Sequence, residues 1–335
     1  MALAPLTFQR DIQSLIHGKK KVWNWREAEN PVRYAYNKLL REKDETRRVL
    51  PVDPFAEVYT LRPGITGIFM ESLDGMGDVW SFLIEGSERA LLIDTGFGLG
   101  DLKGLTEELL GGKPYEVANT HSHFDHAYGN YQFDRIYCHE YEAFKLQRNM
   151  NSHVWDYLFD ECGEGIWYDL RREDLIPFRP YEIVPVPDGH VFDLGDGHEV
   201  ELIFMGGHST GHCGFLDRKN RIFFPGDDCC VGTVGIGMEP NIPYAEYATV
   251  EALHRELLKI IAREAEYDSM FPSHGVLETG PVMLHSLAET CEAVLQNPED
   301  CDIRLSTTHG ERLGKMIFES GYLQYGKDAV YQRPG

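Results

Sequence analysis

The spacing of hydrophobic positions divides most of the chain into two stretches of strands with helices between and after them. From Phe55, short apolar runs rich in β-branched and aromatic residues alternate with Gly, Pro and Asp, a pattern typical of strands joined by turns. The first stretch predicts strands at residues 57–61, 65–70, 79–86, 89–96, 115–120 and 134–140, with a helix at 101–110.

The second stretch repeats this texture further along the chain. Strands are predicted at 181–186, 198–205, 212–217 and 221–227, and two helices at about 247–265 and 280–296 lie on either side of "SMFPSHG". The segment 303–331 is predicted to be extended. Strands grouped in two batches with helices beside them favour an α+β or layered α/β domain.

Two segments depart from this pattern. Residues 8–48 carry spaced apolar and aromatic residues among charges, which predicts two short helices outside the main domain. We therefore divide the chain into an N-terminal helical extension, 1–50, and a main domain, 51–335. An insertion at about 140–180 is rich in aromatic residues, including Trp155, Tyr157 and Trp167.

Composition narrows the class of protein. A chain of 335 residues with 42% hydrophobic and 26% charged residues can bury a large core without disulfides or a structural metal. Its seven cysteines follow no framework spacing, and the Cys229-Cys230 pair is interpreted as buried residues at a strand end. No apolar run is long enough to span a membrane, and the first residues lack a secretory pattern. We expect a cytoplasmic protein with no membrane partner.

The charge is strongly acidic and unevenly distributed. The net charge is -22, yet residues 1–50 hold 11 Lys and Arg against 6 Asp and Glu, which leaves -27 for the remainder. Such a body argues against a nucleic-acid substrate held by a basic surface. The basic arm is expected to dock on the acidic body, its own or that of a partner subunit.

The densest chemical signal is "NTHSHFDHAYGN", which places three histidines and an aspartate within six residues. His121 and His123 are two apart on extended chain and point to the same side, and a turn brings Asp125 and His126 to a neighbouring position. Imidazole and carboxylate groups suit zinc, iron or manganese. The motif predicts ligands for two metal ions.

Further ligands must come from elsewhere in the chain. His208 in "FMGGHSTGHCGF", Asp227 in "IFFPGDDCC" and His274 in "MFPSHG" each follow an apolar run and a Gly or Pro. Such residues let the chain turn sharply, so these three side chains can face a common cleft.

The ordered set "LLIDTG", "THSHFDH", "GGHSTGH", "FFPGDD" and "FPSHG" resembles the metallo-β-lactamase superfamily over about residues 55–280. The resemblance implies a four-layer αββα sandwich with two divalent metals, most simply Zn²⁺, with iron or manganese as alternatives. It implies that one metal is held by His121, His123 and His208, the second by Asp125, His126 and His274, with Asp227 bridging both.

Other residues near these motifs receive supporting roles. The resemblance implies that Asp94 orients the site without binding metal. His212, four residues after His208, is interpreted as a neighbour of the ligands rather than as one of them, and Asp228 as a hydrogen-bonding neighbour of Asp227.

The resemblance implies hydrolysis, with a metal-bridging hydroxide attacking a carbonyl and Asp125 moving its proton. A β-lactamase is the less favoured interpretation, because the best-known ones have a cysteine at the position of Asp227. Acyl-homoserine lactonases often have a tyrosine where Cys230 stands, and glyoxalase II thioesterases are similar around His208 and Asp227. We expect a small thioester, lactone or ester substrate, with phosphodiester hydrolysis as in ribonuclease Z relatives as the alternative.

The aromatic insertion leaves two interpretations open. Its rings either roof the metal cleft and bind an apolar acyl or ring group, or pack on the sandwich or in a homodimer contact.

Overall fold

The computed structural model describes residues 8–10, 21–23, 35–70, 78–166, 171–237, 242–307 and 310–332. Within these ranges no helix is both long and apolar enough to cross a membrane. The helices are α1 Ala35–Lys43, α2 Leu102–Leu110, α3 Phe124–Ala127, α4 Ala143–Asn149, α5 Val250–Ile261 and α6 Val282–Gln296.

Eight strands form the first large sheet, in the spatial order β10-β9-β8-β7-β6-β5-β4-β3. Neighbours from β3 to β7 are antiparallel, whereas β7, β8, β9 and β10 run parallel to one another. The strands are β3 Arg48–Leu50, β4 Asp53–Arg62, β5 Ile65–Met70, β6 Val79–Glu85, β7 Ala90–Ile93, β8 Tyr115–Ala118, β9 Arg135–His139 and β10 Glu182–Val186.

The second large sheet has five strands in the order β11-β12-β13-β14-β16, and a smaller sheet has the order β15-β19-β18-β17. Strands β12, β14 and β16 share one direction, because β12 and β14 are both antiparallel to β13 and β16 is parallel to β14. The strands are β11 Val191–Asp193, β12 Glu199–Phe204, β13 Cys213–Asp217, β14 Ile222–Phe224, β15 Thr233–Gly235, β16 Ser269–Met270, β17 Ile303–Thr307, β18 Gly310–Met316 and β19 Tyr322–Tyr325.

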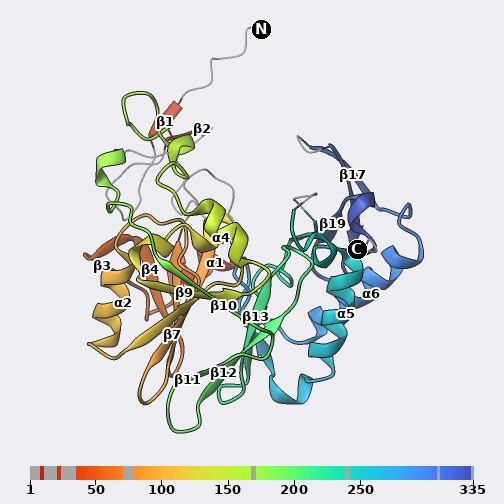
Figure 1. Cartoon of the computed structure of the whole chain (residues 1–335), viewed down its shortest axis with the longest axis horizontal. Helices are drawn as coiled ribbons and strands as arrows, with labels where there is room; N and C mark the ends of the chain where they lie inside the picture. Colours follow the sequence, from red (N-terminus) through yellow and green to blue (C-terminus); the bar gives the residue numbers. More distant parts are fainter. Residues whose placement is uncertain are drawn as a thin grey trace.

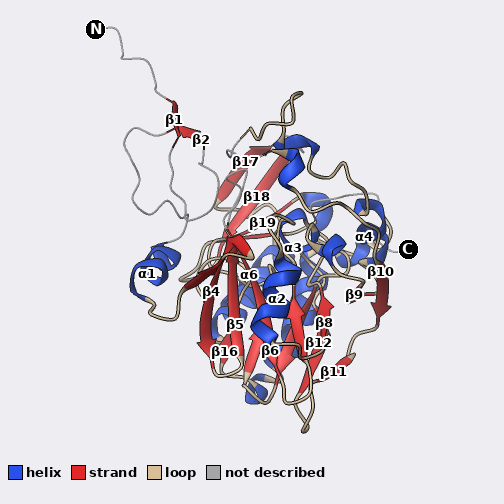
Figure 2. Cartoon of the chain, turned by 90° about the vertical axis from the view of Figure 1, so that its left-hand side faces the viewer, coloured by secondary structure: helices blue, strands red, loops and turns tan. Residues whose placement is uncertain are grey.

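The two large sheets pack face to face, and helices cover both outer faces (Figure 1). Figure 2 shows α2 lying across the outer face of the first sheet. Alternating side chains produce this layering, since Leu91 and Ile93 of β7 lie in the core between the sheets while Leu92 packs outward with Leu105 of α2. The outer face of the second sheet packs on α5 and α6. The predicted four-layer αββα sandwich is confirmed.

Local sequence sets where the main helices begin and end. The Asp101 carboxylate accepts the N–H of Gly104 at 2.8 Å and so caps α2, and Gly111 ends that helix with a positive φ of 59°. Thr249 caps α5 in the same way by accepting the N–H of Ala252. The predicted helices at 101–110, 247–265 and 280–296 are all present, with shorter ends.

The N-terminal region differs from the prediction of two helices. One helix, α1, is present, but strands β1 Phe8–Arg10 and β2 Lys21–Trp23 pair antiparallel where helix was expected. The aromatic and β-branched residues of these short segments favour strand pairing over helix. The remainder of 1–34 lies outside the described residues. Strand β3, at the end of the predicted extension, joins the first sheet. The division of the chain at residue 50 stays a prediction.

Candidate metal centre

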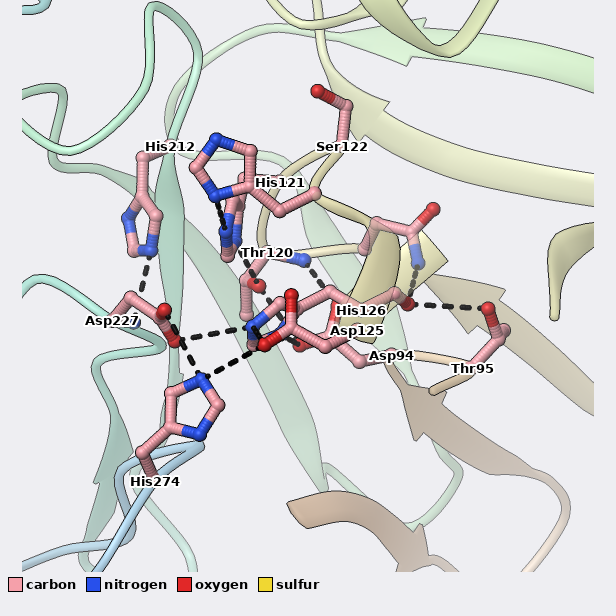
Figure 3. Close-up of polar contacts among 12 residues, drawn as sticks. Asp94, Thr95, Thr120, His121, Ser122, Asp125, His126, His212, Asp227 and His274 are labelled. Atoms are coloured by element: carbon pink, nitrogen blue, oxygen red, sulfur yellow. Dashed lines mark hydrogen bonds and ion pairs between the residues drawn. The ribbon is translucent and has the colours of Figure 1, made fainter. Parts of the chain in front are cut away.

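The predicted ligands lie where strands of both sheets end. Asp94 follows β7, the segment 121–126 follows β8, and His208, Asp227 and His274 follow β12, β14 and β16. Strands β7 and β8 are parallel, and so are β12, β14 and β16. Their carboxyl ends therefore meet at one edge of each sheet, and side chains 180 residues apart in sequence converge (Figure 3).

The first group consists of His121, His123 and His208. Nδ1 of His123 lies 2.9 Å from Nε2 of His121 and 2.9 Å from Nε2 of His208. Ring nitrogens of the three side chains lie within 4.8 Å of one another. Three imidazole nitrogens directed at one point are the donor set of a tetrahedral metal site that keeps a fourth position open.

The second group is built around His126. Its Nε2 lies 3.5 Å from Oδ2 of Asp125 and 3.3 Å from Oδ1 of Asp227. Nε2 of His274 lies 3.3 Å from Asp125 and 3.2 Å from Oδ2 of Asp227. Asp227 also approaches Nε2 of His208 at 3.6 Å, so its carboxylate lies between the two groups.

Hydrogen bonds on the far side of each ring fix which nitrogen faces the centre. Nδ1 of His208 donates to the carbonyl of Gly235 at 2.7 Å, and Nδ1 of His274 to that of Asp78 at 2.5 Å. Nδ1 of His126 donates to Asp94 at 2.9 Å. The Nε2 atom of each ring therefore faces the other histidines and the carboxylates, a position where a bound cation replaces a proton.

Two buried atoms support the same conclusion. Nε2 of His126 and Oδ1 of Asp227 are both buried and lie 3.3 Å from each other, but neither has a hydrogen bond of acceptable geometry. Unsatisfied buried polar atoms are costly, and metal coordination satisfies them without a hydrogen bond. The donor set therefore fits metal ions of the zinc, iron or manganese type.

Asp94 is hydrogen-bonded to Thr120 and His126 and so orients the second group. Its backbone has a positive φ of 63°, which is uncommon for a residue other than glycine and aims the carboxylate inward. One oxygen accepts the N–H of Thr120 at 2.7 Å, and the other accepts the Thr120 hydroxyl at 2.8 Å and Nδ1 of His126. The Thr120 oxygen in turn lies 2.9 Å from Nδ1 of His121.

His212 and Asp228 lie beside the ligands. Nε2 of His212 accepts the backbone N–H of Asp227 at 3.1 Å, and its Nδ1 lies 2.6 Å from Asp228. Asp228 also accepts the backbone N–H of His208 at 3.1 Å. Both residues therefore accept hydrogen bonds from the backbone of ligand segments, whereas the sequence indicated only that they are neighbours of the ligands.

The electrostatic balance differs between the two groups. Burial lowers the pKa of His123 to about 3, with His208 adding to the effect. Burial also lowers the pKa of His126, but the carboxylates of Asp227, Asp125 and Asp94 outweigh it and raise that pKa well above its usual value. In the second group, metal ions and protons therefore compete for the same nitrogens.

The residues of the centre differ in exposure. His121 and His126 are fully buried, whereas the side chains of Asp125, His208 and His274 remain 12–14% exposed. All seven predicted ligands are brought together, and their binding of metal stays a prediction. Sequence reasoning missed Thr120, whose position directly before the histidine motif was the available signal.

The aromatic insertion packs on the sandwich through Trp155. This side chain is buried, donates its Nε1–H to the carbonyl of Phe97 at 2.9 Å, and stacks edge-on against Tyr131 and Tyr128. Tyr157 is 46% exposed. Trp167 lies outside the described residues. For Trp155 the packing interpretation therefore holds, because its ring faces the loop after β7.

Comparisons with known proteins agree with this geometry. A family model described as "Metallo-beta-lactamase superfamily" matches residues 74–274. The acyl-coenzyme A thioesterase MBLAC2 of Homo sapiens is 30% identical over 211 residues, covering 59% of this chain and 72% of that protein. The hydroxyacylglutathione hydrolase GloC of Haemophilus influenzae is 24% identical over 150 residues, covering 42% of this chain and 61% of that protein.

Among solved structures, the DIM-1 metallo-beta-lactamase is similar in fold. It has a TM-score of 0.50 and 18% sequence identity, and the match covers 72% of this chain and 99% of that one.

Proposed function

The chain belongs to the metallo-beta-lactamase superfamily and is a hydrolase, and we propose that it cleaves small thioesters with two bound divalent metals. The observation that carries the two-metal part is the convergence of seven donor side chains with the Asp227 carboxylate between two groups. When bound, such a metal pair acidifies water and polarises a carbonyl oxygen.

The protein's own residues would perform the remaining tasks. The side chain of Asp125 is 14% exposed, so its carboxylate can orient an incoming water and accept its proton. Asp227, between the groups, fixes their separation. Asp94 and Thr120 keep the rings of His126 and His121 in the tautomers that present Nε2 to the centre.

The thioester class is supported by two relatives whose names describe thioester hydrolysis, one of a coenzyme A ester and one of a glutathione ester. It agrees with the similarity to glyoxalase II thioesterases around His208 and Asp227. The body of the chain is strongly acidic, so we expect recognition to centre on the acyl and thioester part rather than on an anionic carrier.

A panel of matched substrates tests this proposal. One acyl group is offered as its coenzyme A thioester, its glutathione thioester and its neutral N-acetylcysteamine thioester, alongside lactones, β-lactams and a bis-aryl phosphodiester. We expect the thioesters to have the highest kcat/KM and the neutral carrier to keep much of it. A phosphodiester or β-lactam hydrolysed faster than every thioester would overturn the substrate class.

Metal analysis of the same preparation checks the site. We expect about two metal ions per chain after purification without chelator, and a marked loss in the Asp227→Ala variant. Less than half a metal ion per wild-type chain would contradict the two-metal site, whatever the substrate panel gives.

A further inference from the structure

A buried carboxylate outside the predicted ligand set connects the two loops of the first group. Glu142 immediately precedes α4 and is fully buried. One oxygen accepts the backbone N–H and the hydroxyl of Ser122, at 3.0 and 2.5 Å. The other accepts the Ser209 hydroxyl at 2.5 Å, the Gly211 N–H at 2.8 Å and the Thr210 hydroxyl at 3.3 Å.

The donors that bond to Glu142 lie next to the proposed metal ligands in the sequence. Ser122 lies between His121 and His123, and Ser209 directly follows His208. A single side chain therefore ties together two segments that are 87 residues apart in sequence and that carry all three ligands of the first group. The second group is held from other directions, by Asp94 at His126 and by the Asp78 carbonyl at His274.

The charge of Glu142 is retained in this setting. Burial raises the pKa of its carboxyl, but Lys145 and the surrounding donors outweigh burial and lower it. The Lys145 ammonium lies 3.8 Å from the carboxylate and is itself buried. A carboxylate is acceptor-only, so both oxygens can serve the five donors at once.

We infer that Glu142 is a positioning residue that sets the spacing of His121, His123 and His208 and so tightens metal binding at the first group selectively. The inference rests on the two-metal site proposed above. Removing a direct hydrogen-bond partner of a metal ligand typically changes metal affinity by about 10- to 100-fold, and Glu142 acts one residue further out, through Ser122 and Ser209.

The Glu142→Gln variant isolates this role. Glutamine keeps the size of the side chain but replaces one acceptor oxygen with an NH₂ donor. Either orientation of the amide then sets that NH₂ against a backbone N–H, of Ser122 on one side or of Gly211 on the other. Hydroxyl donors can rotate to adapt, but backbone N–H groups cannot. The matched control is Glu140→Gln, two residues away and exposed.

Two measurements on the whole chain test the inference. In the metal-free state, hydrogen exchange of peptides covering residues 119–126 and 206–213 should accelerate in Glu142→Gln and stay unchanged in Glu140→Gln. In the zinc-loaded state, chelator competition should show one of the two ions bound about 10- to 100-fold more weakly, with the other unaffected. Cobalt substitution then identifies which group released its ion by the change in its visible spectrum.

Outcomes of three kinds overturn the inference: unchanged exchange in both peptides, unchanged metal affinity, or equal weakening of both ions. If Glu142→Gln does not fold, Ser122→Ala and Ser209→Ala replace it, each removing one hydroxyl donor. Because both act through the same carboxylate, their effects on the first ion should be non-additive in the double variant, and strict additivity would refute the link. A wild-type chain with one metal ion would contradict the two-metal proposal, while the metal-free exchange result would still decide the role of Glu142.

Discussion

Asp94 controls the tautomer of a proposed metal ligand, and replacing it with asparagine tests that control. Asparagine adopts a positive φ nearly as readily as aspartate, so the backbone conformation at 63° is retained. The fixed backbone N–H of Thr120 selects the amide oxygen for itself. The NH₂ group then faces Nδ1 of His126 and favours the tautomer in which that nitrogen accepts and Nε2 carries the hydrogen.

The size of the effect follows from the hydrogen bonds that the substitution alters. Hydrogen bonds to a charged group contribute about 1.5–3 kcal/mol each. Here the bond to His126 is replaced, and the Thr120 hydroxyl, which loses its acceptor, turns toward Nδ1 of His121. One such bond corresponds to roughly 10- to 100-fold in metal affinity, the range found when outer partners of ligands are removed. We expect the larger weakening at the second group, which His126 forms with Asp125 and His274, although His126 also lies close to His121 and Asp227.

Chelator competition on the zinc-loaded protein measures the affinity of each ion separately. The control is Asp196→Asn, since Asp196 also has a positive φ, 50°, but is exposed. Asp94→Asn should release its weaker ion at a lower chelator concentration than wild type, and Asp196→Asn should match wild type. If both variants retain wild-type affinity for both ions, Asp94 does not set the state of His126 and the reasoning is wrong.

Two further predictions concern stability. Burial raises the pKa of the Asp53 carboxyl from 3.8 to about 7. Between these two pH values the folded chain therefore keeps a proton that the unfolded chain has released. Its contribution to stability is therefore greatest below pH 3.8 and falls by about 4 kcal/mol as the pH rises to 7. Urea unfolding should show a smaller decline over this window in Asp53→Asn, and parallel curves would contradict the assignment. Phe82 is buried between the sheets, with its ring centroid 5.0 Å from that of Phe224. The Phe82→Ala variant should lower the free energy of unfolding by about 3–5 kcal/mol. Phe318 is 72% exposed, so Phe318→Ala should change it by less than about 0.5 kcal/mol. Equal destabilisation in these two variants would refute the placement of the core.

Most of the sandwich could be predicted from the sequence because its strands have alternating or continuous apolar patterns of ordinary length. The apolar runs that form β5, β6 and β12 are bounded by turn residues, so the hydrophobic pattern and the turn residues predict the same strand ends. The short strands β3, β11, β15 and β16 were not predicted, since two or three residues without a longer apolar run carry too little pattern to identify a strand, whereas β14 lies in such a run. Tertiary pairing decides such segments, as it decides β1 and β2.

Some residues of the candidate site could be predicted from the sequence and others could not. Ligand residues are of unusual types at sharp turns after apolar runs, so His208 and His274 could be proposed from sequence. Glu142 could not, because a glutamate before a short helix resembles an ordinary exposed residue. Its significance arises only when Ser122 and Ser209, 87 positions apart, are folded against it. Partners that act through distant backbone have no local signature.

The side chains of Asp94 and Glu142 contact the histidine segment at different residues, so replacing each should affect a different proposed metal ion. Asp94 contacts the segment at its ends, at Thr120 and His126, while Glu142 contacts it in the middle, at Ser122. Of these three residues, His126 belongs to the second group and Ser122 lies between two ligands of the first, whereas Thr120 contacts His121 of the first group. Variants at Asp94 and Glu142 should therefore release their two ions in opposite order, and any shared weakening should pass through the Thr120 hydroxyl. Release in the same order from both variants would mean that the segment moves as one rigid unit and that the two carboxylates have no separate roles.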